Sequence, residues 1–148
     1  MRKHIMDFKN RTAIVTGGAR GIGRGIALAL AGRGANVIIA DLDEESAQRV
    51  VNEIKSEGSR SYFCETDVTQ QWSTDQMVEA TLEEYGNLDV LVNNAGVGGA
   101  PGFTNRKIPN VEDWQQTFDV NVFGIVNCSQ SVEKYMIDQS YGKIVNIS

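Results

Sequence analysis

The chain contains few of the residues that build metal centres and reactive thiol sites. Its 148 residues include two cysteines and one histidine, His4. Cys64 and Cys128 show none of the spacings that metal ligands have in zinc sites. We therefore predict that no metal site and no catalytic thiol is present, and that both cysteines are buried and reduced.

Basic charge and long hydrophobic runs are scarce as well. The net charge is −5 at pH 7, whereas a nucleic-acid-binding surface needs a basic face. No apolar run approaches the length of a membrane span, and the basic residues at the start are not followed by the apolar core of a secretory signal. These absences predict a cytoplasmic protein that binds neither nucleic acid nor membrane. The length and the hydrophobic fraction of 41% predict one globular domain over residues 1–148.

Strand and helix patterns alternate along the whole chain. Short runs rich in β-branched residues predict strands at residues 12–15, 36–40, 61–66, 88–92 and 142–148, with amphipathic helices between them. Such alternation favours an α/β fold in which a parallel sheet is covered by helices on both faces.

The segment after the fourth strand has two parts. Residues 97–109 are rich in glycine and proline and predict a loop, whose side chains, including Phe103 and Arg106, could border a substrate pocket. Asn110 and Asp113 then form the pattern of a capping box at the start of a long helix. Residues at helical spacing predict its packing stripe: Phe118, Val122, Ile125, Val126 and Ser129.

A glycine-rich turn, Thr16–Gly23, joins the first strand to the first helix. Such a turn binds a nucleotide pyrophosphate through backbone N–H groups and the positive end of the helix dipole. Gly17 permits the sharp turn, Gly21 lets phosphates approach the backbone, and Gly23 lets the helix pack against the sheet. The spacing differs from G-x-G-x-x-G and lacks the Lys-Ser/Thr ending of a P-loop. By itself the turn could equally be structural.

Polar residues follow the next three strands. Asp41 ends the second strand, where a carboxylate binds the adenosine ribose in dinucleotide sites. Asp67 follows the third strand and, taken alone, is better explained as a turn or helix-capping carboxylate. Asn93–Gly96 follows the fourth strand and could likewise be purely structural, because asparagine bonds readily to neighbouring backbone.

The Thr16–Gly23 turn, the Asn93–Gly96 motif and Asn121 in the following helix together resemble the classical short-chain dehydrogenase/reductase family. The motifs come in the family's order and cover the whole chain. The resemblance implies a Rossmann-type doubly wound parallel sheet, in three αβα layers, with about five strands in the order 3-2-1-4-5. It also implies hydride transfer between a nicotinamide cofactor and an alcohol or carbonyl substrate.

The resemblance further assigns roles to individual residues. Asn121 would be catalytic, holding a water molecule in the proton relay. The helix region Asn110–Gln139 would take part in a homo-oligomer. The cofactor would be bound by residues of the strand ends: Gly17, Arg20, Gly21, Ile22, Gly23, Asp41, Leu42, Asp67, Val68, Asn94, Ala95 and Gly96.

Asp41 favours NAD over NADP. Its carboxylate can accept hydrogen bonds from a ribose 2′-OH but would repel a 2′-phosphate. Arg20 opposes this preference, since a basic residue in the glycine turn can hold a 2′-phosphate. Leu42 supplies no second cation. The balance predicts NAD.

The family's catalytic Tyr-x-x-x-Lys pair does not occur among the 148 residues. Tyr62, Tyr85, Tyr135 and Tyr141 are followed four positions later by Thr, Asp, Gln and Val. The family's serine usually falls one position beyond Ser148. We therefore expect the chain to be the cofactor-binding half of a dehydrogenase, with negligible activity by itself and an apolar helix face left exposed.

Two other functions stay open. The chain could be a catalytically inactive nucleotide-binding module or fragment, which would bind NAD without turnover. A Rossmann-like methyltransferase also has a glycine turn and an acidic residue after the second strand, but the Asn93–Gly96 motif and the glycine spacing speak against it.

Overall fold

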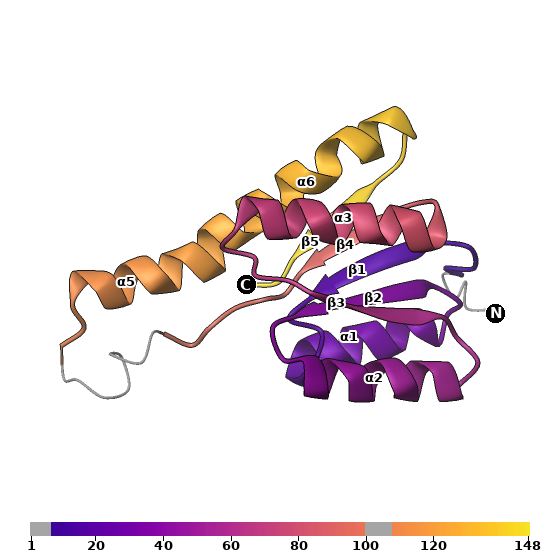
Figure 1. Cartoon of the computed structure of the whole chain (residues 1–148), viewed down its shortest axis with the longest axis horizontal. Coiled ribbons are helices and arrows are strands. Elements are labelled where there is room, and N and C mark those ends of the chain that lie inside the picture. Colours follow the sequence, from indigo (N-terminus) through magenta and orange to yellow (C-terminus); the bar gives the residue numbers. More distant parts are fainter. Residues whose placement is uncertain (1–6, 100–107) are drawn as a thin grey trace, which may run out of the picture.

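The computed structural model describes residues 7–99 and 108–148, and its core is a parallel sheet of five strands in the order β3-β2-β1-β4-β5 (Figure 1). This confirms the predicted fold class and strand order. Phe103 and Arg106, which the sequence placed beside a substrate pocket, lie outside the described residues. The strands are β1 (Thr12–Thr16), β2 (Asn36–Asp41), β3 (Ser61–Glu65), β4 (Val90–Asn93) and β5 (Lys143–Asn146).

Helices cover both faces of the sheet. The helices α1 (Gly21–Ala31) and α2 (Glu44–Ser56) lie on one face, and α3 (Gln71–Tyr85) and α6 (Gly124–Asp138) lie on the other (Figure 1). Alternate residues of β1 therefore enter two separate cores: Ala13 and Val15 pack toward α1 and α2, whereas Ile14 packs toward α3 and α6. Because β1 is fully buried on both faces, its three central residues, Ala13–Val15, are all apolar.

The long helical region before α6 begins as predicted. In α5 (Val111–Phe118), the side chain of Asn110 accepts the backbone N–H of Asp113, and the Asp113 carboxylate accepts that of Asn110, each at 2.9 Å. This is the capping box that the sequence indicated. A π-helical turn, η1 (Asp119–Phe123), separates α5 from α6.

The predicted packing stripe of this region lies mostly outside the core of the chain. Phe118, Val122 and Val126 are each more than 40% exposed, while Cys128, Val132 and Met136 are buried against the sheet. Phe118 precedes the π turn, and the buried residues of α6 follow it. The wider hydrogen-bonding ring of the π turn shifts the phase of the side chains that follow it around the helix axis. The exposed stripe agrees with the expectation that an apolar helix face is left uncovered.

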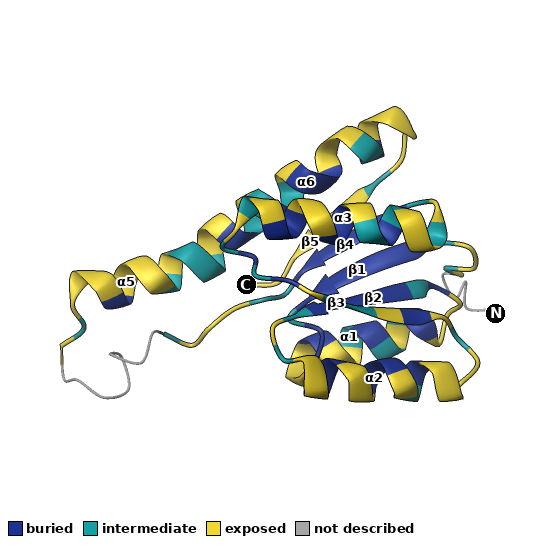
Figure 2. Ribbon diagram, in the orientation of Figure 1, coloured by how far each residue is buried: buried dark blue, intermediate teal, exposed yellow. Residues whose placement is uncertain are grey.

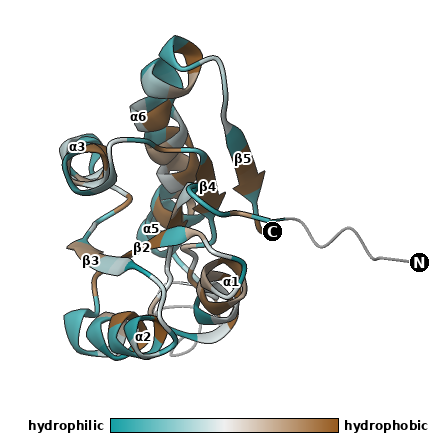
Figure 3. Cartoon of the chain, turned by 90° about the vertical axis from the view of Figure 1, so that its right-hand side faces the viewer, coloured by the Kyte–Doolittle hydropathy of each residue, from teal (hydrophilic) through white to brown (hydrophobic). Residues whose placement is uncertain are grey.

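Two apolar surfaces are left open at one end of the sheet. Helix α5 projects beyond the sheet and is exposed along most of its length (Figure 2). Strand β5 is an edge strand that is exposed throughout, and its two central residues, Ile144 and Val145, are hydrophobic (Figure 3). The expectation of an uncovered apolar helix face thus agrees with the exposure of Trp114 and Phe123, each 51%. Among residues 7–99 and 108–148, no helix is long and apolar enough to cross a membrane.

The two cysteines differ in their surroundings. Cys128 is fully buried, and burial raises its thiol pKa to about 12. Cys64 is partly buried, and burial raises its pKa too, but by less. The prediction that both thiols are buried is therefore right for Cys128 and only half right for Cys64.

Thiol alkylation should separate the two cysteines. At pH 8 the folded protein should take up one equivalent of iodoacetamide, at Cys64, because a thiol of pKa near 12 is ionised in only about one molecule in ten thousand at that pH. A second equivalent should appear only in denaturant. Intact-mass and peptide mass spectrometry measure both, and modification of Cys128 in the folded protein would contradict the prediction.

Candidate nucleotide-binding site

The glycine turn after β1 is built around a close backbone approach. Gly17 has φ +61°, and a Cβ there would lie 2.9 Å from the Cα of Ala95. Gly23, in the first turn of α1, is tighter still, since a Cβ would lie 2.1 Å from the carbonyl oxygen of Gly17. Both positions therefore require glycine, and they bring the start of α1 against the ends of β1 and β4.

Gly21 requires glycine for a different reason. It has φ +50°, and a Cβ would meet no atom within 4 Å, so its surroundings are open space. No side chain caps α1, and its first turn holds no acidic residue, whereas Asp43 caps α2. The start of α1 is therefore a positively polarised helix end that faces open space, which suits an anionic phosphate. Ile22 points outward and is 68% exposed.

Asn94 fastens this turn to β4. Its side-chain amide donates to the carbonyl oxygens of Thr16 (3.0 Å) and Gly17 (3.1 Å). The hydroxyl of Thr16 accepts the backbone N–H groups of Asn94 and Ala95, both at 3.0 Å. The Thr16 hydroxyl was not among the predicted site residues. Its signal in the sequence is a hydroxyl at the last position of a buried strand, directly before the glycines.

Asp41 lies at the end of β2, facing the same turn. One carboxylate oxygen accepts the backbone N–H of Ala19 at 3.0 Å, and the other accepts that of Asp43 at 3.1 Å. An ionised carboxylate has about four acceptor positions, so further hydrogen-bond donors can still be accepted. Leu42 follows with 64% of its surface exposed. A fixed negative charge therefore stands at the far side of the turn from β4.

Asp67 and Val68, which follow β3, form a third side of the candidate site, beside the glycine turn and Asp41. One carboxylate oxygen of Asp67 accepts the backbone N–H and the hydroxyl of Thr69, at 2.9 and 2.7 Å. This is the turn-forming role that the residue pattern alone favoured. The carbonyl of Val68 accepts the side-chain amide of Asn127 at 2.9 Å, which ties this loop to α6.

Asn121 lies in the π turn η1. Its side-chain oxygen accepts the backbone N–H of Val97 at 2.8 Å, and its amide donates to the carbonyl of Val97 at 2.9 Å. The amide thus holds the chain just after the Asn93–Gly96 motif. Both the oxygen and the amide nitrogen of its side chain are therefore bonded to backbone in this structure.

These loops enclose a cavity of about 430 Å³ at the carboxyl ends of the strands. It brings together ten of the twelve predicted cofactor residues but not Ile22 or Gly23, and it does not include Asn121, the predicted catalytic residue. Sequence reasoning missed Ala40, Asp43, Thr66, Val97 and Val120. The lining consists of Gly17, Arg20, Gly21, Ala40, Asp41, Leu42, Asp43, Thr66, Asp67, Val68, Asn94, Ala95, Gly96, Val97 and Val120.

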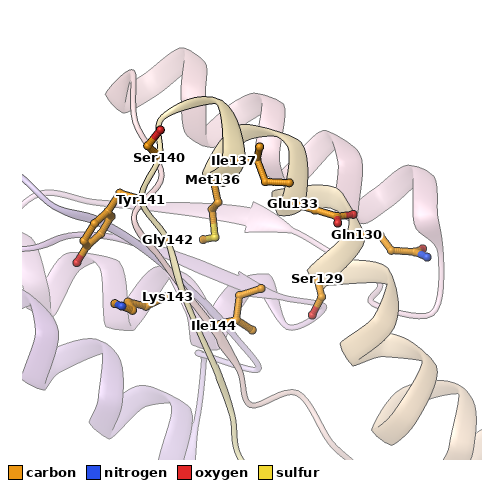
Figure 4. Close-up of a pocket in the computed structure, with 10 residues that line it drawn as sticks. All are labelled: Ser129, Gln130, Glu133, Met136, Ile137, Ser140, Tyr141, Gly142, Lys143 and Ile144. Carbon is orange, nitrogen blue, oxygen red and sulfur yellow. The ribbon is translucent and has the colours of Figure 1, made fainter.

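A larger cavity, of about 780 Å³, lies between α6 and β5 (Figure 4). Tyr141 and Lys143 line it, but they stand at the amino end of β5, where the Lys143 amine lies 5.9 Å from the Tyr141 ring. The cavity of about 430 Å³, the candidate nucleotide cavity, lies at the opposite, carboxyl ends of the parallel strands. Tyr141 and Lys143 are therefore not placed to act on a ligand bound there.

Metal ligands do not gather in the part of the chain that the structure describes. Among these residues no group of three or more His, Cys, Asp and Glu side chains could hold a metal ion. The chemistry of the cavity is that of backbone N–H groups, asparagine amides and carboxylates.

The family model for short chain dehydrogenases matches residues 11–148. Among curated relatives, the (2S)-[(R)-hydroxy(phenyl)methyl]succinyl-CoA dehydrogenase subunit BbsD of Thauera aromatica is 38% identical over 143 residues, which are 97% of this chain and 56% of that protein. The chain thus spans about half the length of the curated relatives that it matches.

Solved structures agree with this assignment. A 7α-hydroxysteroid dehydrogenase complexed with NADH and 7-oxo glycochenodeoxycholic acid is similar with a TM-score of 0.87 and 31% identity, over 96% of this chain and 54% of that one. A short-chain dehydrogenase/reductase from Burkholderia phymatum in complex with NAD has a TM-score of 0.85 and 30% identity, over 96% and 50%. Sequence, fold and site geometry together place this chain in the short-chain dehydrogenase/reductase family.

Proposed function

We propose that this chain binds NAD(H) and forms the cofactor-binding part of an oxidoreductase. That enzyme would transfer a hydride between the nicotinamide and a small-molecule alcohol or carbonyl substrate. The observation that carries the proposal is the single cavity shared by the open start of α1 and the carboxylate of Asp41. One end of it suits a pyrophosphate and the other suits a ribose.

Different residues of the cavity would bind different parts of the cofactor. The backbone around Gly21 would receive the pyrophosphate, because it combines free space with a polarised helix end. Asp41 would accept the ribose hydroxyls through its remaining acceptor positions. Asp67 and Val68 would border the adenine, and Asn94, Ala95 and Gly96 would border the nicotinamide ribose. The solved relatives that carry NAD or NADH support this assignment.

The nicotinamide would supply the hydride, and the proton chemistry would need groups other than those in this cavity. None of the four tyrosines is followed four positions later by lysine. An unassisted tyrosine hydroxyl has a pKa of about 10 and is a poor base at neutral pH. Asn121 would hold the segment at Val97 and serve the proton relay when an acid–base pair is present. The alternative of a nucleotide-binding module without catalysis rests on the same observation.

Self-association through the region Asn110–Gln139 stays a prediction. The exposed apolar side chains on this region support it, because an uncovered patch of this kind favours association. They include Val111, Trp114, Phe118, Val122, Phe123, Val126 and Ile137. A cytoplasmic location also stays a prediction.

Calorimetric titration of the 148-residue protein with NAD⁺, NADP⁺ and S-adenosylmethionine tests the proposal. We expect NAD⁺ to bind at least tenfold more tightly than NADP⁺, because a 2′-phosphate would meet the Asp41 carboxylate. S-adenosylmethionine should not bind, and no alcohol should be oxidised. Failure to bind NAD⁺ would contradict the proposed cofactor, and measurable turnover would contradict the expected inactivity.

Asp41→Ala should weaken NAD⁺ binding about tenfold and bring the two affinities close together, because it removes a charge-assisted hydrogen bond to the ribose and a repulsion of the phosphate. Glu65→Ala is the matched control, since Glu65 ends the neighbouring strand in register with Asp41 and does not line the cavity. An unchanged preference in Asp41→Ala would overturn the role of this carboxylate.

A further inference from the structure

Arg20 is the cation nearest to the ribose end of the cavity, and its guanidinium group is already engaged. It forms a close ion pair with the Asp43 carboxylate, and its Nε donates to the hydroxyl of Ser46 at 3.2 Å. Arg20 lines both the nucleotide cavity and a neighbouring groove of about 480 Å³ between α1 and α2. The direction in which the Arg20 guanidinium points therefore affects whether this end of the cavity can bind a ribose that carries a 2′-phosphate.

Asp43 is held firmly in place. One of its carboxylate oxygens accepts the backbone N–H of Ser46 at 3.0 Å and so caps α2, while the other faces Arg20. Its own backbone N–H donates to Asp41 at 3.1 Å. The side chain of Asp43 is 28% exposed and that of Arg20 75%, so the acid is the more buried and more firmly bonded partner of the pair.

The other arginines of this groove also have acidic partners. Arg24 contacts both carboxylate oxygens of Glu53 at 2.7 Å, and Arg49 contacts Glu45 at 2.6 Å. A 2′-phosphate approaching this edge of the cavity would therefore meet the carboxylates of Asp41 and Asp43, and arginines whose charges are already compensated.

We propose that Asp43 is a second determinant of cofactor choice, which acts by holding Arg20 away from the position of a 2′-phosphate. The inference rests on the proposed function, because it presupposes that an adenosine ribose lies beside Asp41. Without the charge of Asp43, Arg20 becomes a mobile cation at the rim of the cavity, and the NAD preference set by Asp41 weakens.

Asp43→Asn is the informative substitution. Asparagine is as good a helix N-cap as aspartate, so the cap of α2 is retained while the negative charge is lost. We expect the affinity for NADP⁺ to rise about tenfold and that for NAD⁺ to change less than twofold. Because the new contact joins exposed charges, the gain should shrink as salt rises from 20 to 500 mM, which loss of a structural cap would not produce.

Three further variants make the calorimetric test decisive. Arg20→Gln together with Asp43→Asn should abolish the gain, so that the double variant binds NADP⁺ no more tightly than Arg20→Gln alone does. Glu53→Gln is the matched control, since it releases Arg24, which lines the groove but not the nucleotide cavity. It should change neither affinity. Circular dichroism and thermal melting confirm that each variant is folded.

The outcomes separate this inference from the proposed function. If the unmodified chain binds neither NAD⁺ nor NADP⁺, the proposed function fails and the inference falls with it. If the chain prefers NAD⁺ but Asp43→Asn changes the ratio of the two affinities by less than twofold, the role proposed for Asp43 is wrong and the proposed function stands. A double variant that binds NADP⁺ several-fold more tightly than Arg20→Gln alone overturns it as well.

Discussion

Gly23→Ala is expected to lower the free energy of unfolding by about 2–3 kcal/mol and to abolish measurable NAD⁺ binding. A Cβ at this position would lie 2.1 Å from the carbonyl oxygen of Gly17 and 2.5 Å from the side-chain amide of Asn94. The same two atoms share a hydrogen bond of 3.1 Å. The added methyl group must therefore push α1 away from the sheet and break the contact that shapes the glycine turn.

Gly25→Ala provides the matched control in the same helix. A Cβ at Gly25 would meet no atom within 4 Å, and alanine is favoured over glycine in a helix by about 1 kcal/mol. This variant should be slightly more stable than the parent and should bind NAD⁺ normally. Urea denaturation and calorimetric titration measure both quantities. Equal effects of the two substitutions would show that the close approach at Gly23 is not what requires glycine.

Asp89→Ala is expected to lower the free energy of unfolding by about 3 kcal/mol while leaving NAD⁺ affinity unchanged in the folded protein. Asp89 is 3% exposed and lies before β4, at the amino end of the sheet. Its carboxylate accepts the backbone N–H of Thr12 at 2.9 Å and the guanidinium of Arg11 at 2.7 Å. It also accepts the amide of Asn87. Alanine would leave the buried N–H of Thr12 without its acceptor.

Asp75→Ala is the control for loss of a hydrogen-bonded carboxylate at the surface. Asp75 accepts the hydroxyl of Ser131 and the amide of Gln71, and these bonds lower the pKa of the exposed carboxyl group. Its substitution should change the free energy of unfolding by less than about 1 kcal/mol, because water replaces the lost partner and alanine favours the helix. If Asp89→Ala were no more destabilising than Asp75→Ala, the buried network around Thr12 would not stabilise the sheet.

The substitutions at Gly23 and Asp89 differ in the properties that they are expected to change. The Gly23 contact lies at the carboxyl ends of the strands, where the nucleotide cavity is, so it should affect stability and binding together. The Asp89 network ties the starts of β1 and β4 at the opposite end, so it should affect stability alone. The free energy of unfolding and the NAD⁺ affinity should be measured for both variants. The comparison tests whether the amino ends of the strands contribute only to stability and the carboxyl ends also to binding.

Most of the fold could be predicted because the strands are short apolar runs separated by amphipathic helices. The β1 segment is buried on both faces, so its central residues, Ala13–Val15, are apolar without alternation, which is typical of a central parallel strand. The π turn η1 could not be predicted in this way, and it changes the phase of the later residues around the helix axis. The apolar stripe Phe118, Val122 and Val126 lies outside the core, as expected for a helix face without a partner.

The site was predictable for a related reason. In a parallel sheet the strand ends converge, so polar residues directly after successive strands meet in one place. Asp41 and Asp67 could therefore be grouped from the sequence and do line one cavity. The Arg20–Asp43 pair could not be anticipated, because it depends on how the turn after β2 aims the two side chains.

The sequence by itself determined the order and type of the elements, the glycine positions and the polar residues at the strand ends, since these follow from local patterns of size, charge and hydrophobicity. The tertiary structure alone decided which glycines contact backbone and which face open space. It also decided the direction in which the apolar face of α6 points and the carboxylate with which each arginine pairs. These properties depend on distances between segments remote in the chain. Local sequence patterns cannot specify such distances, because they arise only when the sheet and its two helical layers pack together.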